Sequence, residues 1–266
     1  MRNTVAFDPH RFETAAHYYV DGRPAYSDGL IKRVASFVEL NGSQAILDLG
    51  TGPGTLALAL APYVAETYAI DPEPQMLRIA SAQAGIRGIE LNLILGDSFS
   101  LDPSIGPFDL VTIGRAFHWM DREKTLAVLD QIIKPGGGIA FFWTRHLKLP
   151  ENEWHQRYEA ILDPYRGPNS ARKTLRSPEW IPHESILLNS RFCVLERIGI
   201  IERRLTPLEK LVTRALSFSG TSSGVIGDRE AAMAQEIRDA LSPYANEDMI
   251  LEVVESEALL AFRPVA

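Results

Sequence analysis

The sequence predicts an α/β protein with a doubly wound, mainly parallel sheet of seven strands. Short apolar runs alternate with segments of helical periodicity across 44–145, which is typical of strands joined by crossover helices. Two further strand-like runs, at 192–205 and 251–262, complete the expected sheet. The chain of 266 residues is 45% hydrophobic and 23% charged, which suits one large globular domain with an appended lobe.

The individual elements follow from where the apolar runs begin and end. The first five strands are expected at 44–49, 67–70, 91–95, 108–113 and 139–143. Helices are expected at 28–38, 55–63, from Pro72 or Pro74 onward, over 126–133, at 207–217 and at 228–241. Ser27 or Asp28 can cap the first helix, and the run Lys134-Pro135-Gly136-Gly137-Gly138 is expected to separate a helix from the fifth strand.

Net charge and composition argue against several classes of function. The formal charge of −7 offers no electrostatic footprint for a phosphate backbone, so no nucleic-acid partner is expected. The single cysteine, Cys193, rules out an intrachain disulfide, and a cysteine-based zinc site is not expected. His146, His155 and His183 lack the spacing of metal ligands, so no metal is expected. Without an apolar signal segment or 18 consecutive apolar residues, the chain is expected to be cytoplasmic and to have no membrane partner.

A glycine-rich turn follows the first expected strand. Asp48 precedes Gly50, Gly52 and Gly54, and glycines let a backbone pass close to a ligand because they have no Cβ atom. A dinucleotide site requires G-x-G-x-x-G, but Thr55 stands at the position of the third glycine. A carboxylate at Asp48 would repel a pyrophosphate and attract an ammonium group, directly or through water. This combination indicates a cationic cofactor that carries an amino acid, namely S-adenosylmethionine.

Two more acidic residues stand at the ends of neighbouring strands. Asp71 ends the second strand and can accept hydrogen bonds from both ribose hydroxyls, although an NAD site uses the same device. Asp97 follows the third strand and can accept from an adenine amine. Each acid taken alone is explained equally well as the cap of the next helix or turn. Together with Asp48, and without a basic phosphate clamp, they favour the sulfonium cofactor.

The motifs in this order resemble the class I S-adenosylmethionine-dependent methyltransferases, in their small-molecule branch, over about residues 40–145. They are Leu47-Asp48-Leu49-Gly50-Thr51-Gly52-Pro53-Gly54, Ala69-Ile70-Asp71-Pro72 with Met76, Gly96-Asp97-Ser98, Phe108-Asp109-Leu110-Val111 and Lys134-Pro135-Gly136-Gly137. A leader with Phe12, Ala16, Tyr19, Arg23-Pro24 and Tyr26, the run Ala116-Phe117-His118-Trp119 and the run Ser217-Phe218-Ser219 are similar to trans-aconitate-methyltransferase-like enzymes. The resemblance implies a Rossmann-like fold.

The resemblance also implies which residues bind S-adenosylmethionine. They are Tyr19, Arg23, Asp48, Gly50, Thr51, Gly52, Asp71, Pro72, Met76, Gly96, Asp97, Ser98, Arg115 and Ala116. The glycine turn would hold the methionine part, Asp71 the ribose, and Met76 and Asp97 the adenine. Tyr19 and Arg23 would close over the cofactor, with the guanidinium of Arg23 facing its carboxylate. Arg115 stands where the subgroup often has glutamine, so only a backbone role carries over to it.

The expected reaction is transfer of the activated methyl group to a small molecule by in-line displacement, at oxygen (a carboxyl oxygen included), nitrogen or carbon. His118 is the candidate catalytic base, with a positioning histidine as the alternative. The candidate acceptor-binding residues are Phe117, His118, Trp119, Trp143 and Trp154, and core packing is an equal alternative for Trp119 and Trp143. Two other functions stay open: a protein that binds S-adenosylmethionine without transferring methyl groups, and a nucleic-acid methyltransferase, which the net acidity disfavours.

Four segments are expected along the chain. Residues 1–27 would form an N-terminal lid and 28–145 the cofactor-binding core. Residues 146–190, which are rich in aromatic side chains, would form an inserted helical lobe that covers the substrate, and 191–266 the rest of the sheet with a helical cover. The sequence leaves open whether the protein is a monomer or a homodimer.

Overall fold

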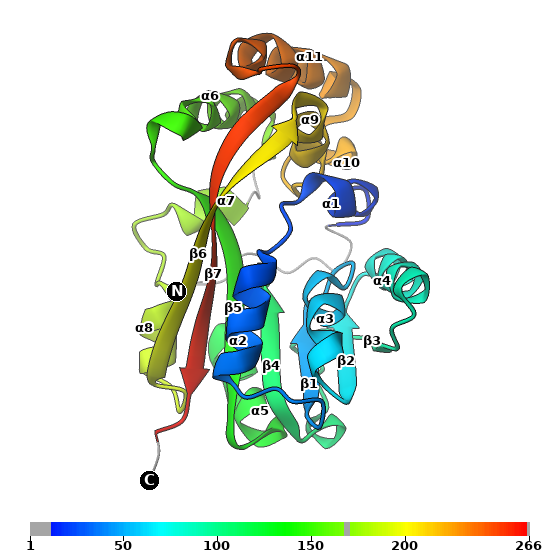
Figure 1. Cartoon of the computed structure of the whole chain (residues 1–266), viewed down its shortest axis with the longest axis vertical. Helices are drawn as coiled ribbons and strands as arrows, with labels where there is room; N and C mark the ends of the chain where they lie inside the picture. Colours follow the sequence, from blue (N-terminus) through cyan, green and yellow to red (C-terminus); the bar gives the residue numbers. More distant parts are fainter. Residues whose placement is uncertain (1–11, 168–170, 265–266) are drawn as a thin grey trace.

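A seven-stranded sheet organises the computed structural model, which describes residues 12–167 and 171–264 (Figure 1). The strand order is β3-β2-β1-β4-β5-β7-β6. The strands are β1 (Ala45–Leu49), β2 (Glu66–Asp71), β3 (Asn92–Leu95), β4 (Phe108–Gly114), β5 (Ile133–His146), β6 (Val194–Pro207) and β7 (Met249–Phe262). The first five pair in parallel, whereas β7 runs antiparallel between β5 and β6. The predicted mainly parallel α/β sheet is thus confirmed.

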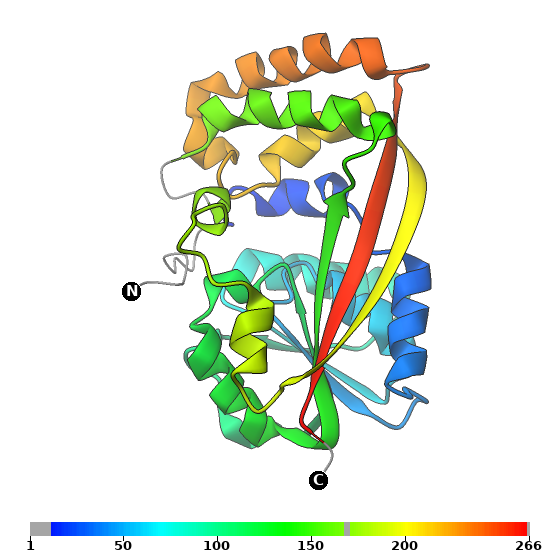
Figure 2. The same ribbon diagram turned by 90° about the vertical axis from the view of Figure 1, so that its left-hand side faces the viewer.

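Helices cover both faces of this sheet (Figures 1 and 2). The α-helices are α1 (Ala16–Gly22), α2 (Asp28–Phe37), α3 (Thr55–Leu60), α4 (Pro74–Arg87), α5 (Arg122–Ile132), α6 (Glu153–Leu162), α7 (Ala171–Leu175), α8 (His183–Leu188), α9 (Leu208–Leu216), α10 (Ser223–Ile226) and α11 (Glu230–Leu241). Short 3-10 turns are η1 (Ala61–Tyr63), η2 (Pro103–Ile105), η3 (Phe117–Trp119), η4 (Pro150–Asn152), η5 (Asp163–Tyr165), η6 (Gly227–Arg229) and η7 (Ser242–Tyr244). Ser27 caps α2 as predicted, because its side chain accepts a hydrogen bond from the Gly29 amide.

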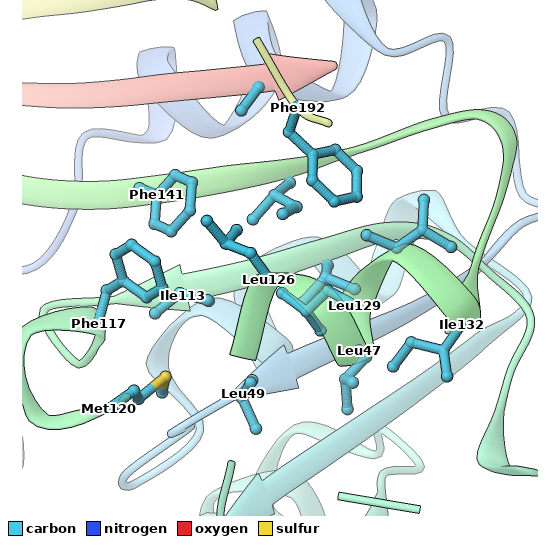
Figure 3. Packing of buried hydrophobic residues seen from close by; sticks show 14 of the residues in the cluster. Leu47, Leu49, Ile113, Phe117, Met120, Leu126, Leu129, Ile132, Phe141 and Phe192 are labelled. Atoms are coloured by element: carbon cyan, nitrogen blue, oxygen red, sulfur yellow. The ribbon is translucent and has the colours of Figure 1, made fainter. Parts of the chain in front are cut away.

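The main core lies between the sheet and α5. Leu126, Leu129 and Ile132 recur at helical spacing on one face of α5 and pack onto Leu47 of β1 and Ile113 of β4 (Figure 3). Phe117 and Met120, which follow β4, belong to the same buried cluster. The loop after β4 is therefore anchored in the core, and this fixes the backbone next to the glycine turn.

Strand β5 is much longer than the sequence predicted, β7 is slightly longer, and β6 has the predicted length but begins two residues later. Residues 134–138, expected as a turn, form the first part of β5, and β5, β6 and β7 each have 14 residues. These strands extend past the parallel part of the sheet and carry α6, α9 and α11 at their far end (Figures 1 and 2). Helix α1, in the predicted lid, packs against α9. The first 11 residues of that predicted lid lie outside the described residues.

The predicted helical lobe, 146–190, does not form one unit. Trp154 of α6 is buried in a cluster with Leu211 of α9 and Met233 of α11, at the far end of the long strands. Leu187 of α8 is instead buried in the main core beside the sheet. The apolar residues of α6 and α8 pack against different partners. The segment is therefore divided between two hydrophobic clusters.

The described residues contain neither a membrane-spanning helix nor a cluster of metal ligands. No helix within 12–167 or 171–264 has the length and apolar character needed to cross a membrane. In the same residues, no group of three or more His, Cys, Asp or Glu side chains is arranged so that it could hold a metal ion.

Candidate functional site

A cleft opens at the carboxyl ends of β1 to β4. It encloses about 760 Å³ of empty space, including the part open to solvent. Its lining residues are Phe12, Tyr19, Leu49, Gly50, Gly52, Asp71, Pro72, Glu73, Met76, Gly96, Asp97, Ser98, Gly114, Arg115, Ala116, Trp119 and Met120. Ligands of open α/β sheets bind at this edge.

The glycine turn between β1 and α3 forms one wall of the cleft. Gly50 and Gly52 have φ angles of 71° and 57°, a backbone region that side chains rarely adopt. The amides of Gly50 and Thr51 donate to the Ile70 carbonyl at 2.8 and 2.9 Å, which ties the turn to β2. A Cβ atom at Gly50 would lie 2.7 Å from that of Ala116, so a glycine is required where the turn meets the loop after β4.

Asp48 lies beneath this turn and not in the wall of the cleft. The Thr51 hydroxyl (2.6 Å) and the Ala57 amide (3.3 Å) donate to its Oδ2, and the Thr112 hydroxyl donates to Oδ1 at 2.7 Å. Burial raises the pKa of this carboxyl, and the three hydrogen bonds oppose that shift. Neither Asp48 nor Thr51 lines the cleft, and both side chains support the turn from below. Of the two modes of contact predicted for Asp48, directly or through water, this position favours the one through water.

Asp71 lines the cleft at the end of β2. Its Oδ2 accepts from the Gly52 amide at 2.8 Å and its Oδ1 from the Glu73 amide at 3.0 Å. Burial raises the pKa of Asp71 to about 6, although the two amides lower it in part. The carboxylate is thus held in place at the end of β2, with its remaining lone pairs available to a ligand.

The residues that were predicted to surround an adenine ring line the cleft. Pro72, Met76, Gly96, Asp97 and Ser98 all contribute to its wall. The Oδ1 atom of Asp97 also accepts from the Phe99 and Ser100 amides, at 2.9 and 2.8 Å. Asp97 thus caps the turn after β3, as the alternative interpretation held, and its contact with an adenine amine stays a prediction that this capping role permits.

The two predicted arginines both lie near the ring of Tyr19. Arg115 lines the cleft, and its Nη1 donates to the Pro24 carbonyl at 3.4 Å. Arg23 lines an adjoining side pocket that shares Tyr19 and Arg115 with the cleft, and its Nη2 donates to the Ser217 carbonyl at 3.1 Å. Burial lowers the pKa of Arg23 to about 10, a value at which it still carries its charge at neutral pH.

Most of the predicted acceptor residues do not reach the cleft. Phe117 is buried against Phe141, with ring centroids 4.7 Å apart. Trp143 packs against the main core, and Trp154 donates its indole N–H to the Leu251 carbonyl at 3.0 Å within the helical cluster. The η3 turn after β4 directs Phe117 inward, and Trp119 is the predicted aromatic residue that lines the cleft. These positions correct the binding roles predicted for Phe117, Trp143 and Trp154.

The predicted base His118 is not among the described residues that line the cleft. Its ring centroid lies 4.6 Å from that of Trp119. Since a catalytic base must reach the proton that it removes, the structure gives His118 no support in that role. The alternative, a positioning histidine that acts through Trp119, is compatible with this contact.

The sequence interpretation missed several lining residues, which are Phe12, Leu49, Glu73, Gly114 and Met120. Leu49 ends β1 and Gly114 ends β4, so both could have been found from the rule that ligands bind at strand ends. Phe12 belongs to the leader motif but had been given no role. Glu73 caps α4 through the Gln75 amide at 3.0 Å, and its place in the cleft depends on how β2 and α4 join.

Comparison with known proteins finds relatives of the part of the chain that forms the cleft. Residues 46–137 match the family model described as a methyltransferase domain. An uncharacterized methyltransferase of Mycobacterium tuberculosis is 27% identical over 168 residues, which are 63% of this chain and 65% of that protein. The demethylmenaquinone methyltransferase of Thermus thermophilus is 42% identical over 97 residues, which are 35% of this chain and 44% of that enzyme. The chain thus aligns with less than two thirds of the length of these relatives.

The fold is also found among solved structures. A methyltransferase of Geobacter sulfurreducens, solved in complex with S-adenosyl-L-homocysteine, superposes with a TM-score of 0.55 at 14% identity. The match covers 97% of this chain and 99% of that one. At this identity the likeness shows a shared fold alone.

Proposed function

We propose that the protein, whose residues 46–137 match a methyltransferase-domain model, binds S-adenosylmethionine in its cleft and methylates a small molecule. The observation that carries this proposal is the distribution of charge in the cleft. Asp71, Glu73 and Asp97 supply carboxylates, and Arg115 is the only basic residue among the described lining residues. A pyrophosphate would find no basic clamp there, whereas hydroxyl and amine donors would find acceptors.

The residues present fit the cofactor. Asp71 would accept from the ribose hydroxyls, because its carboxylate is fixed by two backbone amides and faces the cleft. Met76 and Pro72 would contact the adenine with apolar surface, and Asp97 would accept from its amine. Gly50 leaves room for the methionine part, where a Cβ atom would fill the space beside Ala116. Arg23 would face the carboxylate of the cofactor from the side pocket.

Methyl transfer requires little from the protein beyond alignment of the cofactor with the acceptor. The bound cofactor supplies a methyl group that is already activated by a sulfonium centre. Phe12, Tyr19 and Trp119 form an aromatic group at the cleft, since the ring of Phe12 lies edge-on to Tyr19 at 6.3 Å and to Trp119 at 5.8 Å. These rings exclude water and restrict the approach of an acceptor. We assign proton removal to no side chain, because His118 does not line the cleft.

The class of the acceptor and the atom that is methylated remain proposals. A small-molecule acceptor is supported by the net charge of −7 and by a cleft bordered by aromatic rings at one end. Methylation at oxygen, a carboxyl oxygen included, at nitrogen or at carbon follows from the resemblance alone. The cytoplasmic location, the absence of nucleic-acid and membrane partners, and the monomeric or homodimeric state remain predictions from the sequence.

Isothermal titration calorimetry tests the cofactor assignment. S-adenosylhomocysteine is expected to bind and NAD is not. In the variant Asp71→Asn the dissociation constant for S-adenosylhomocysteine is expected to rise roughly 30–150-fold, because hydrogen bonds to a charged acceptor contribute about 2–3 kcal/mol. Asp109→Asn is the matched control: this carboxylate also accepts from a backbone amide, that of Ala45 at 2.8 Å, but lies at the opposite ends of the strands. Equal losses in both variants would refute the assignment.

The same titration should depend on pH. A protonated Asp71 loses acceptor capacity, and its pKa is raised to about 6 in the ligand-free cleft. Affinity for S-adenosylhomocysteine is therefore expected to fall as the pH drops below 6, by up to tenfold per pH unit.

The folding stability of the ligand-free protein should depend on pH in the opposite direction. A raised carboxyl pKa stabilises the fold below the unfolded value of 3.8, and this stability is lost as the pH rises through 6. Asp71→Asn should show neither dependence; retention of the binding dependence would contradict the role of Asp71.

A further inference from the structure

The run Ser217-Phe218-Ser219 follows helix α9 and is not among the described residues that line the cleft or the side pocket. It lies instead against Arg23, which lines the side pocket and was assigned above to the carboxylate of the cofactor. The Ser217 carbonyl accepts a hydrogen bond from Nη2 of Arg23 at 3.1 Å. The centre of the Phe218 ring lies 4.3 Å from the guanidinium carbon of the same arginine. The run therefore contacts a residue of the binding site without reaching the cleft itself.

The last turn of α9 also fixes the backbone next to Arg23. The Nε atom of Arg214 donates to the Gly22 carbonyl at 3.1 Å. A Cβ atom at Gly22 would lie 2.8 Å from the Thr213 carbonyl oxygen, so a glycine is required where the end of α1 meets α9. Helix α1 lies beside α9 in both views of the chain (Figures 1 and 2). Residues 213–218 thus hold both the backbone before Arg23 and its side chain.

The groups that hold Arg23 leave its positive charge without a counterion. An aromatic face attracts a cation, and a carbonyl at the end of a helix carries a partial negative charge, but neither is an anion. The charged groups that act on Arg23 in the described parts of the chain are tyrosines and Arg115. Its Nε atom is buried and makes no hydrogen bond within 12–167 and 171–264. An acidic side chain in place of Phe218 would compete with a ligand carboxylate, whereas a ring orients the guanidinium and leaves it available.

We propose that Phe218 is a positioning residue for the cofactor. Its ring, together with the Ser217 carbonyl, orients the guanidinium of Arg23 toward the carboxylate of the cofactor. The inference rests on the proposed function, because it takes that carboxylate as the anion that Arg23 binds. Phe218 does not line the cleft, so it acts through Arg23 and not on the ligand. Its effect is therefore confined to ligands that carry the carboxylate.

Calorimetry with two ligands separates this role from a structural one. S-adenosylhomocysteine is compared with decarboxylated S-adenosylhomocysteine, which lacks only the carboxylate. The wild type is expected to bind the first ligand roughly tenfold more tightly or better, and Arg23→Gln to lose most of this preference, because a hydrogen bond between charged groups is lost.

Phe218→Leu and Phe218→Met replace the ring by apolar chains. In both variants the preference for the carboxylate is expected to fall roughly threefold to tenfold, the range of a cation–π contact. The affinity for the decarboxylated ligand should stay within about twofold of the wild-type value, because that ligand does not use Arg23. A merely structural loss would instead weaken both ligands alike and leave the preference unchanged.

Three further variants serve as controls. Phe218→Tyr retains the ring and should keep the preference. Tyr165→Leu removes a ring from the same helical cluster, one whose centre lies 5.3 Å from the guanidinium carbon of Arg229, and should not change the preference. In Arg23→Gln, the addition of Phe218→Leu should lower the preference no further, because the ring acts through Arg23.

Each outcome decides the inference. It is overturned if the ring-free variants keep the wild-type preference, if Phe218→Tyr loses as much as Phe218→Leu, if Tyr165→Leu loses as much, or if Phe218→Leu still lowers the preference in Arg23→Gln. It is also overturned if Arg23→Gln keeps the full preference, since another group would then bind the carboxylate. In all these cases S-adenosylhomocysteine still binds and the proposed function stands. A wild-type protein that binds neither ligand would refute the proposed function and the inference with it, so the two failures are distinguishable.

Discussion

Replacement of Gly50 by valine is expected to abolish detectable cofactor binding and to lower the free energy of unfolding by about 2–6 kcal/mol. A Cβ atom at this position would lie 2.7 Å from the Cβ of Ala116 and 3.3 Å from the Cε of Met120. The φ angle of 71° adds strain for a β-branched residue. The added side chain would also occupy the wall of the cleft. Urea denaturation and titration with S-adenosylhomocysteine measure the two effects.

Gly136→Val is the matched control for this variant. Gly136 has a similar φ angle, 81°, but a Cβ atom there would meet nothing within 4 Å. Only the strain contributes at this site, so a loss of about 1–3 kcal/mol is expected, with unchanged affinity for S-adenosylhomocysteine. If the two variants lost equal stability and both bound the ligand normally, the close approach of the turn to Ala116 would have no functional meaning.

Replacement of Glu252 by alanine is expected to lower the free energy of unfolding by about 3–5 kcal/mol. Glu252 is 1% exposed, and it accepts from Nη1 and Nη2 of Arg214 at 2.7 and 3.0 Å. His146 lies 2.6 Å from the same carboxylate. Arg214 also donates from Nε to the Gly22 carbonyl at the end of α1. Without Glu252, Arg214 would keep a buried charge without its partner, and the junction of α1, α9 and β7 would weaken.

The acid dependence of this pair gives an independent check. Burial alone would raise the pKa of Glu252, but hydrogen bonds from His146 and Arg214 outweigh it and hold the pKa well below its usual range. A lowered carboxyl pKa contributes stability above the unfolded value of 4.5, and this stability is lost as the pH falls below it. Glu252→Gln should therefore be less stable than the wild type at pH 7, and its own stability should fall little further between pH 7 and pH 4.

Glu209→Ala serves as the control for Glu252→Ala. Glu209 pairs with Arg238 at 2.6 Å, but both side chains are exposed. The expected loss is at most about 1 kcal/mol, because solvent screens an exposed pair. A loss at Glu252 no larger than that at Glu209 would show that the buried pair does not hold the helical cluster to the sheet.

The sequence was most informative where a property depends on near neighbours. The glycine turn, the strand ends at Asp71 and Asp97, and the cap at Ser27 were predicted because each is set by local backbone chemistry. The parallel direction of the first strands followed from the alternation of apolar runs with helices, since crossover connections leave few topologies. These features account for one wall of the cleft, which Gly50, Gly52, Asp71 and Asp97 line.

The roles of individual side chains were less predictable, since they depend on contacts far along the chain. Asp48 turned out to support the turn partly because Thr112 lies opposite it in the neighbouring strand. Phe117 follows the same strand end as Trp119, but a 3-10 turn sends only one of the two rings into the cleft. Trp154 was expected over the substrate, yet α9 and α11 bury it elsewhere. No local pattern distinguishes these outcomes.

A crystal structure of the complex with S-adenosylhomocysteine tests the central claim most directly. The ligand is expected in the cleft at the ends of β1 to β4. Its ribose hydroxyls should lie within hydrogen-bonding distance of Asp71, its adenine beside Met76, and its sulfur toward Trp119. A ligand bound elsewhere, or one in the cleft whose ribose does not touch Asp71, would contradict it.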